Sequence, residues 1–205
     1  MFDKSPQATR VISAIRELIT STESPVILAI DGGSGAGKST IAELIGNEFD
    51  AAVIPLDDFY SADIPDPAWR DFSVEERFQR VFRWNAVRRE VLKPLKEGQR
   101  ATWFAFDFDS GMRPDGTYGI EKEAKIYEAT DVVILEGVYS ASPQLADLVD
   151  FSILIDVPVH ERHDRLDGRQ DAEFSKSWRE VWDEVEAYYF GSVRPKGSFD
   201  LVVRG

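Results

Sequence analysis

A glycine-rich segment, flanked by a short apolar run and a helical pattern, constrains the fold of this chain more than any other feature. Residues 26–30 are apolar at every position and too few for a helix, so they predict a strand buried on both faces of a parallel sheet. Residues 32–39 follow with the sequence GGSGAGKS, and a helix-forming run begins at Thr40. Strand, glycine turn and helix in this order favour an open α/β sheet.

The segment 32–39 fits the pattern G-x-x-x-x-G-K-[ST], which binds polyphosphates. Glycines let backbone N–H groups wrap around phosphate oxygens, and the N-terminus of the next helix adds its partial positive charge. Lys38 would reach the β- and γ-phosphates of a nucleotide, and the Ser39 hydroxyl would bind Mg²⁺. An incidental lysine in a glycine-rich connection is the alternative interpretation. The predicted nucleotide-binding residues are Gly32, Gly33, Ser34, Gly35, Ala36, Gly37, Lys38, Ser39 and Thr40.

A second buried strand is predicted over residues 132–135, and it ends at Glu136. If this strand lies beside the strand 26–30, Glu136 faces the metal and its water shell. Mg²⁺ keeps several waters and needs few protein carboxylates, so one acid here is enough. A strand-terminal acid that simply meets solvent is the alternative.

Asp57 and Asp58 end a further strand candidate, residues 51–56. Successive side chains of a strand point in opposite directions, so only one of the two can face the phosphates. An aspartate there could take the proton of a hydroxyl that attacks the γ-phosphate, and Asp57 is also a candidate metal ligand with Ser39 and Glu136. Turn formation or helix capping is the alternative role.

Three arginines stand close together in an otherwise acidic chain. Arg162, Arg165 and Arg169 share one helical face by their i, i+3, i+7 spacing, and Gly168 could act as a hinge. They could close over a transferring phosphoryl group. A solvated helix face with ion pairs to neighbouring acids is the alternative.

The chain organisation predicts one domain over residues 1–205, with a lid at about 160–175 and an acceptor-binding insertion at about 58–128. Within the insertion, Ser73 and Glu76 have the spacing of a capping box at a helix start. That helix carries an apolar face from Val74 to Leu92. Residues 101–107 and 118–127 are expected to form a hairpin around the turn at 113–116.

Composition excludes several classes of function. The 205 residues carry a formal charge of −13, which disfavours nucleic acid and anionic membranes as partners. With no cysteine and only two histidines, the chain has no disulfide, thiolate zinc site, iron–sulfur cluster or multi-histidine metal site. The N-terminus shows neither a signal segment nor a membrane span, so a cytoplasmic location is expected. A homo-oligomer stays open.

These motifs, in this order, resemble the uridine kinase and phosphoribulokinase group of P-loop kinases, over nearly the whole chain from Val26 to Val203. The resemblance implies a P-loop NTPase sheet of five mainly parallel strands, helices on both faces, a small helical lid, and ATP with Mg²⁺. It gives Asp57, in the run Asp-Asp-Phe-Tyr, the role of catalytic base, and it puts Tyr60 near the substrate. Lys38, Arg165 and Arg169 would act at the phosphates, and Arg162 at the substrate.

The departures from that family concern the acceptor. Uridine–cytidine kinases carry Tyr-Asp-Phe-x-x-His-x-Arg in the segment that meets the nucleoside, whereas residues 106–113 read FDFDSGMR. Asp107 and Arg113 remain as candidate substrate residues, but Phe106 and Gly111 replace the tyrosine and the histidine. A site without those two polar groups should no longer prefer a pyrimidine base. The sequence therefore predicts a small hydroxyl-bearing acceptor of another kind.

Two other functions stay open from sequence. A P-loop GTPase or regulatory ATPase would hydrolyse nucleotide without an acceptor, but the chain has no Asn-Lys-x-Asp segment for guanine. A non-catalytic nucleotide-binding module is also conceivable, although Lys38, Ser39, Asp57 and Glu136 are all intact.

Overall fold

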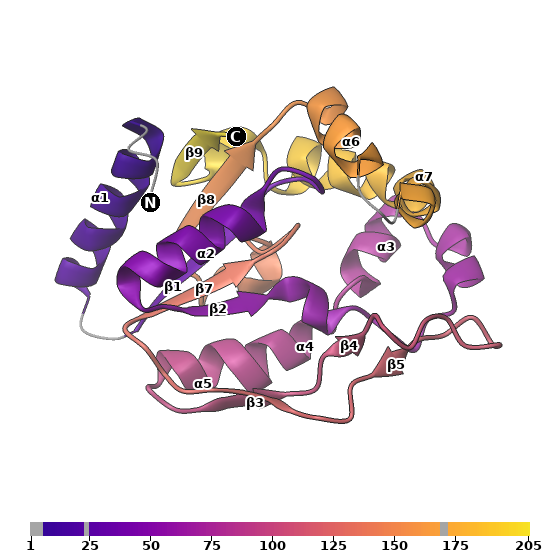
Figure 1. Cartoon of the computed structure of the whole chain (residues 1–205), viewed down its shortest axis with the longest axis horizontal. Coiled ribbons are helices and arrows are strands. Elements are labelled where there is room, and N and C mark those ends of the chain that lie inside the picture. The colour runs from indigo at the N-terminus through magenta and orange to yellow at the C-terminus, as the bar shows by residue number, and fades with distance from the viewer. Residues whose placement is uncertain (1–5, 23–24, 169–171) are drawn as a thin grey trace.

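A five-stranded parallel sheet in the order β2-β7-β1-β8-β9 forms the centre of the computed structural model, which describes residues 6–22, 25–168 and 172–205 (Figure 1). Each neighbouring pair of strands is parallel. The predicted fold class is therefore confirmed. The strands are β1 (Val26–Asp31), β2 (Ala52–Pro55), β7 (Val132–Glu136), β8 (Phe151–Asp156) and β9 (Leu201–Arg204).

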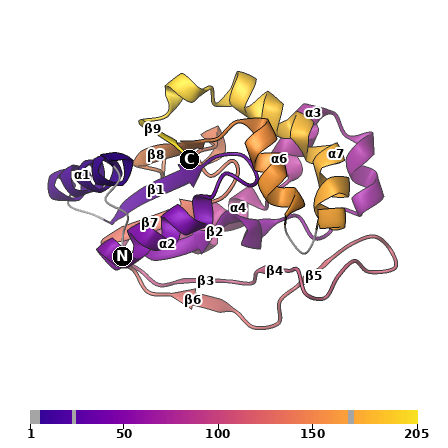
Figure 2. The same ribbon diagram turned by 45° about the horizontal axis from the view of Figure 1, so that its top comes forward.

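Helices cover both faces of this sheet (Figures 1 and 2). Alternate residues of the central strand divide between two cores: Leu28 packs on one face and Ile27 on the other. The first core includes side chains from α1 (Pro6–Ser21) and α2 (Lys38–Phe49). The second includes side chains from α3 (Val74–Arg80) and α7 (Ala172–Tyr188), together with a helical stretch over residues 84–96. That stretch comprises α4 (Trp84–Ala86), the π-helical η3 (Val87–Leu92) and α5 (Lys93–Lys96).

The remaining elements lie around the carboxyl edge of the sheet and at its side. The helix α6 (Val159–Asp167) follows β8, and the π-helical turn η5 (Tyr189–Val193) continues α7. Four short elements are 3₁₀ turns, namely η1 (Leu56–Phe59), η2 (Asp66–Asp71), η4 (Pro143–Leu145) and η6 (Lys196–Ser198).

The expected hairpin is present in two antiparallel pieces. The strand β3 (Ala101–Trp103) pairs with β6 (Lys125–Tyr127), and β4 (Phe106–Asp107) pairs with β5 (Gly119–Ile120). Beyond β4 and β5 the hairpin closes at the predicted turn, where the Gly116 N–H donates to the Arg113 carbonyl at 2.9 Å. The hairpin runs below the sheet in Figure 1.

One predicted helix is broken in two. The capping box of Ser73 and Glu76 is confirmed, but α3 ends at Arg80 instead of continuing to Leu92. Phe82 leaves the helix because it forms an isolated bridge with Tyr60, and the Arg83 N–H donates to the Phe59 carbonyl at 2.8 Å. This break joins the segment after β2 to residues 82–83.

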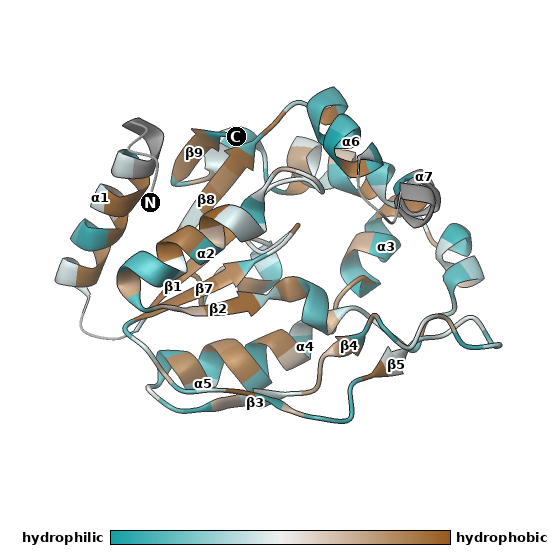
Figure 3. Cartoon of the chain, viewed as in Figure 1, coloured by the Kyte–Doolittle hydropathy of each residue, from teal (hydrophilic) through white to brown (hydrophobic). Residues whose placement is uncertain are grey.

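Hydropathy follows this architecture. In Figure 3 the strands of the sheet are hydrophobic, whereas α6 is largely hydrophilic. Within the described parts of the chain, no helix combines the length and the apolar character needed to cross a membrane.

Candidate active site

The carboxyl edge of the sheet brings together the segments that the sequence singled out. Glu136, the last residue of β7, is in register with Ile30 of β1 on one side and Pro55 of β2 on the other. The glycine-rich loop after β1 and the turn η1 after β2 therefore begin next to Glu136. This is the arrangement in which parallel α/β sheets bind ligands, outside the carboxyl ends of their strands.

The glycine-rich loop, residues 32–39, has a backbone that suits phosphate binding. Gly35 and Gly37 have φ of 80° and 89°, in the left-handed region that glycine enters without strain. Lys38 begins α2 and is 9% exposed, and its Nζ donates to the Gly33 carbonyl at 3.2 Å. One ammonium hydrogen is thus used by the loop, which leaves donors for phosphate oxygens.

Ser39 and Glu136 form the part of the site that fits a magnesium ion. The Ser39 hydroxyl donates to Glu136 Oε1 at 3.1 Å. Burial raises the pKa of Glu136, the charge of Asp57 raises it further, and Lys38 and Ser39 oppose that shift. The described residues contain no group of three or more His, Cys, Asp or Glu side chains able to hold a metal. A hydroxyl with one or two carboxylates suits Mg²⁺, which takes most of its ligands from water and phosphate.

Asp57 and Asp58 differ in exposure, although not for the reason of strand alternation. Both lie on η1, and Asp58 is buried, accepting hydrogen bonds from Trp103 Nε1 at 2.9 Å and from Lys125 Nζ at 2.9 Å. Asp57 is exposed, and within the described part of the chain its carboxylate accepts no hydrogen bond. The surrounding protein still removes enough water to raise the pKa of Asp57, an effect that Lys38 opposes and Asp58 increases.

Tyr60 stands next to this pair in an aromatic cluster. Its ring centroid lies 4.7 Å from that of Phe82, 5.8 Å from Phe106 and 6.1 Å from Phe108. Burial, together with the charges of Asp57 and Glu186, keeps the pKa of Tyr60 well above its ordinary value. Tyr60 is therefore a neutral hydroxyl beside Asp57.

The two remaining hairpin candidates have local contacts. Asp107 Oδ1 accepts from the Ser110 N–H at 2.9 Å, and Arg113 is an exposed residue of the turn. No hydrogen bond or ion pair in the described chain connects either side chain to Asp57.

The arginines of the predicted lid occupy different environments. Arg162 is buried against the loop, where its Nη1 donates to the Ser34 carbonyl at 2.8 Å and pairs with Glu186 Oε2 at 2.9 Å. Arg165 is half exposed, with Nη1 at 3.5 Å from the carbonyl oxygens of Gly35 and Ala36. Arg169 lies outside the described residues.

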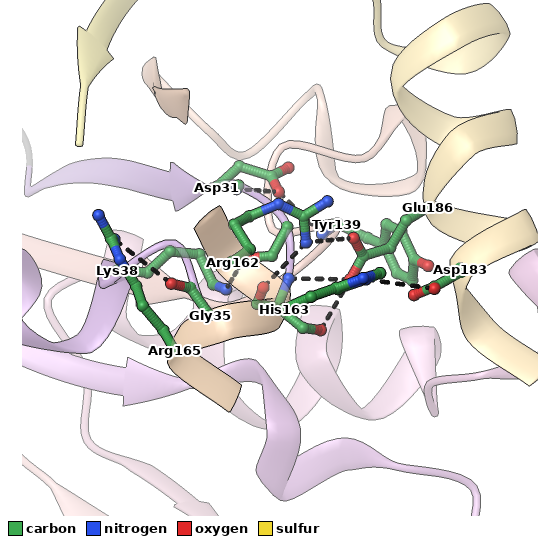
Figure 4. A network of polar contacts seen from close by, with 12 residues as sticks. Asp31, Gly35, Lys38, Tyr139, Arg162, His163, Arg165, Asp183 and Glu186 are labelled. Atoms are coloured by element: carbon green, nitrogen blue, oxygen red, sulfur yellow. Dashed lines mark hydrogen bonds and ion pairs between the residues drawn. The ribbon is translucent and has the colours of Figure 1, made fainter. Parts of the chain in front are cut away.

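Two acids that the sequence analysis did not single out contribute to the site. Asp31, at the end of β1, is fully buried and accepts from the backbone N–H groups of Gly32, Tyr139 and Ala141 and from Tyr189 Oη. Glu186 on α7 contacts Ser34 and Arg162, and Figure 4 shows Glu186 beside Arg162. An acid that ends an apolar strand was a usable signal for Asp31, whereas Glu186 carries no motif.

Comparison with known proteins agrees with this geometry. A model of the phosphoribulokinase/uridine kinase family matches residues 27–165. A uridine kinase of Halobacterium salinarum is 27% identical over 172 residues, which cover 82% of this chain and 71% of the relative. A uridine kinase of Clostridium tetani is 29% identical over 180 residues, covering 83% and 78%.

Solved structures share the fold. One described as a possible uridine kinase from Bacillus stearothermophilus has a TM-score of 0.60 at 19% identity, covering 94% of this chain and 98% of the other. The D-glycerate 3-kinase of Cryptococcus neoformans has a TM-score of 0.59 at 15% identity, covering 88% and 84%.

The parallel sheet and its glycine-rich loop, together with the family match and the uridine kinase relatives, identify a P-loop kinase, an enzyme that transfers a phosphoryl group to a hydroxyl. Because the family model matches well over half of this chain, the chain belongs to the phosphoribulokinase/uridine kinase family.

Proposed function

We propose that this kinase transfers the γ-phosphoryl group of ATP to a hydroxyl of a small metabolite other than uridine or cytidine, with Asp57 as the catalytic base. The observation that carries the proposal is the position of Asp57. It is an exposed carboxylate without a hydrogen bond in the described chain, and its pKa responds to Lys38 of the phosphate-binding loop. Asp58 next to it is occupied by Trp103 and Lys125 and is not available to a substrate.

In the proposed reaction, Asp57 accepts the proton of the acceptor hydroxyl as its oxygen forms the new bond to the γ-phosphorus. The bond from that phosphorus to the β–γ bridging oxygen breaks, and ADP leaves. Lys38 neutralises charge on the β- and γ-phosphates, and Arg165 and Arg169 close over the transferring group. Mg²⁺, held by Ser39 and Glu136 with Asp57 as a further candidate ligand, would neutralise charge on phosphate oxygens.

The acceptor would lie between Asp57 and the aromatic cluster around Tyr60. The ring centroid of Phe106 lies 5.1 Å from that of Tyr118 and 4.6 Å from that of Phe108. Residue 106 therefore offers the acceptor an aromatic ring but no hydroxyl. Gly111 has φ of 67° and offers no side chain. Asp107 and Arg113 remain the proposed polar contacts of the acceptor, in an insertion that would serve as its binding region.

The assignment of the base is tested by comparing two neighbouring substitutions. Asp57→Asn should lower kcat roughly 100-fold or more because proton removal is lost, while ATP still binds. Asp58→Asn should lose much less, because an asparagine oxygen can still accept from Trp103. Single-turnover rates and ATP titrations measure both effects. Equal losses, or a larger loss for Asp58→Asn, would contradict the assignment.

The pH profile gives an independent test of Asp57. Protonation of the base stops catalysis, so kcat/KM should fall as pH drops through the Asp57 pKa, which lies above the ordinary aspartate value. Asp58→Asn removes a like charge and should move this acid limb to lower pH. Glu136 also has a raised pKa, so an acid limb that belongs to Asp57 should persist in the residual activity of Glu136→Gln. A limb that Asp58→Asn leaves in place would count against Asp57.

The proposed acceptor class is tested by competition kinetics. At least one sugar, sugar phosphate or vitamin bearing a hydroxyl should have a higher kcat/KM than uridine. The reason is that the two polar groups that would contact the pyrimidine ring of uridine are missing. Each lost hydrogen bond in a buried site costs about 1–3 kcal/mol. Phe106→Tyr restores one hydroxyl and serves as the matched variant, which should raise kcat/KM for uridine. Uridine above every other acceptor in the unmodified protein would show the acceptor proposal to be wrong.

A further inference from the structure

Glu186 is a nearly buried acid that reaches the phosphate-binding loop from a distant helix. It lies on α7, 152 residues after Ser34, and is 6% exposed. Its Oε1 accepts from the Ser34 N–H at 2.8 Å and from the Ser34 hydroxyl at 2.7 Å. A carboxylate is an unexpected neighbour for a loop that binds anions, so its presence needs a physical reason.

Arg162 supplies that reason. Its Nη1 lies 2.9 Å from Glu186 Oε2 and also donates to the Ser34 carbonyl at 2.8 Å. The pair thus contacts the N–H, the hydroxyl and the carbonyl of one loop residue, and the charge of Glu186 is balanced. Charge-assisted hydrogen bonds of buried groups are among the strongest in proteins, provided that both ions are paired. Figure 4 shows Arg162 between the loop and Glu186.

The packing of α6 on the loop explains two glycines that the motif itself leaves free. A Cβ on Gly33 would lie 2.3 Å from Arg162 Cζ and 2.7 Å from Glu186 Oε2. A Cβ on Gly35 would lie 2.7 Å from the Arg162 carbonyl oxygen and 3.1 Å from Leu166 Cγ. A larger residue at Gly33 would displace the Arg162 and Glu186 side chains, and one at Gly35 would push the backbone of α6 away from the loop. The loop sequence is therefore fitted to α6 as well as to phosphate.

A residue just after α7 also holds the start of the loop. Tyr189, directly after α7, donates from Oη to Asp31 Oδ2 at 2.7 Å, and Asp31 Oδ1 accepts from the Gly32 N–H at 2.7 Å. Contacts that originate near the end of α7 thus hold both Asp31 and Ser34. The chain between them has little freedom left before any nucleotide binds.

We propose that Glu186 is a positioning residue that sets the conformation of the phosphate-binding loop before nucleotide binds, through Ser34 and with Arg162 as its counter-ion. Arg162 then acts on the loop and not on the acceptor. The inference rests on the proposed function only in requiring that the loop binds nucleotide phosphates.

The inference is tested by measuring the Kd of Glu186→Gln for ADP and for ATP by calorimetry, with no acceptor present. Glutamine keeps the length and one acceptor oxygen but removes the charge. The Kd for ADP and for ATP should both rise about tenfold, because the charge-assisted hydrogen bonds from Ser34 to Glu186 are weakened and both nucleotides use that loop. At saturating ATP, kcat should stay within about threefold of the parent value, so that KM changes more than kcat.

Glu184→Gln is the matched control. Glu184 lies two residues before Glu186 on α7, its side chain is 67% exposed and pairs with Arg77, so its substitution should leave both Kd values within about twofold. Ser34→Ala removes only the hydroxyl contact and should raise Kd about threefold. The double variant with Glu186→Gln should raise Kd by less than the product of the two single fold-changes, since both substitutions affect the same contact.

The outcomes separate the two proposals. A melting temperature that falls while both Kd values stay unchanged would reduce Glu186 to a structural residue and overturn the inference. Tighter binding would also overturn it, because Glu186 would then compete with phosphate. If Glu186→Gln does not fold, an unchanged Kd in Ser34→Ala contradicts the inference in its place. A parent protein that binds neither ADP nor ATP would contradict the proposed function, and with it this inference.

Discussion

The buried carboxylate of Asp31 is the interaction on which the site most depends. It ends the central strand and accepts four hydrogen bonds, from the first loop residue, from two backbone N–H groups after Glu136 and from Tyr189 after α7. Burial raises the pKa of Asp31, an effect that the hydrogen bonds from Ala141, Tyr189 and Gly32 and the charge of Lys38 oppose. One side chain thus joins the glycine-rich loop, the segment after Glu136 and the turn that follows the helix carrying Glu186. Buried carboxylates with all their acceptor positions used fix one arrangement of their surroundings.

A second consequence is strain next to the site. Tyr139 has φ of 72°, in the left-handed region that tyrosine rarely enters, and its N–H donates to Asp31 Oδ1 at 2.9 Å. Its ring packs 4.8 Å from that of Tyr189 and 5.5 Å from that of Phe78. The hydrogen bond and the packing hold a conformation that the residue would not adopt alone. The chain after Glu136 is thereby set at the edge of the site.

Sequence patterns predicted the parts of this molecule that depend on local physics. The buried strands, the loop and the capping box of Ser73 follow from apolar runs, glycine and side-chain hydrogen bonds within a few residues. The break at Phe82 was missed because its cause is a bridge to Tyr60 on another segment. The exposure of Asp57 relative to Asp58 was expected from strand alternation, yet it arises from a 3₁₀ turn and from Trp103 and Lys125.

The arginine face shows the same limit. Its helical spacing could not reveal that Arg162 is buried, because Glu186 pairs with it from a helix whose pattern indicates only packing.

A kinase and a nucleotide hydrolase differ in whether ATP consumption needs an acceptor. ATP consumption is therefore measured with and without a panel of nucleosides, vitamins, sugars and sugar phosphates. We expect ATP consumption to require one class of acceptor, to yield the phosphorylated acceptor in equal amount, and to fall roughly 100-fold or more in Lys38→Ala. Steady ATP hydrolysis without any acceptor, equally fast in its presence, would contradict the account.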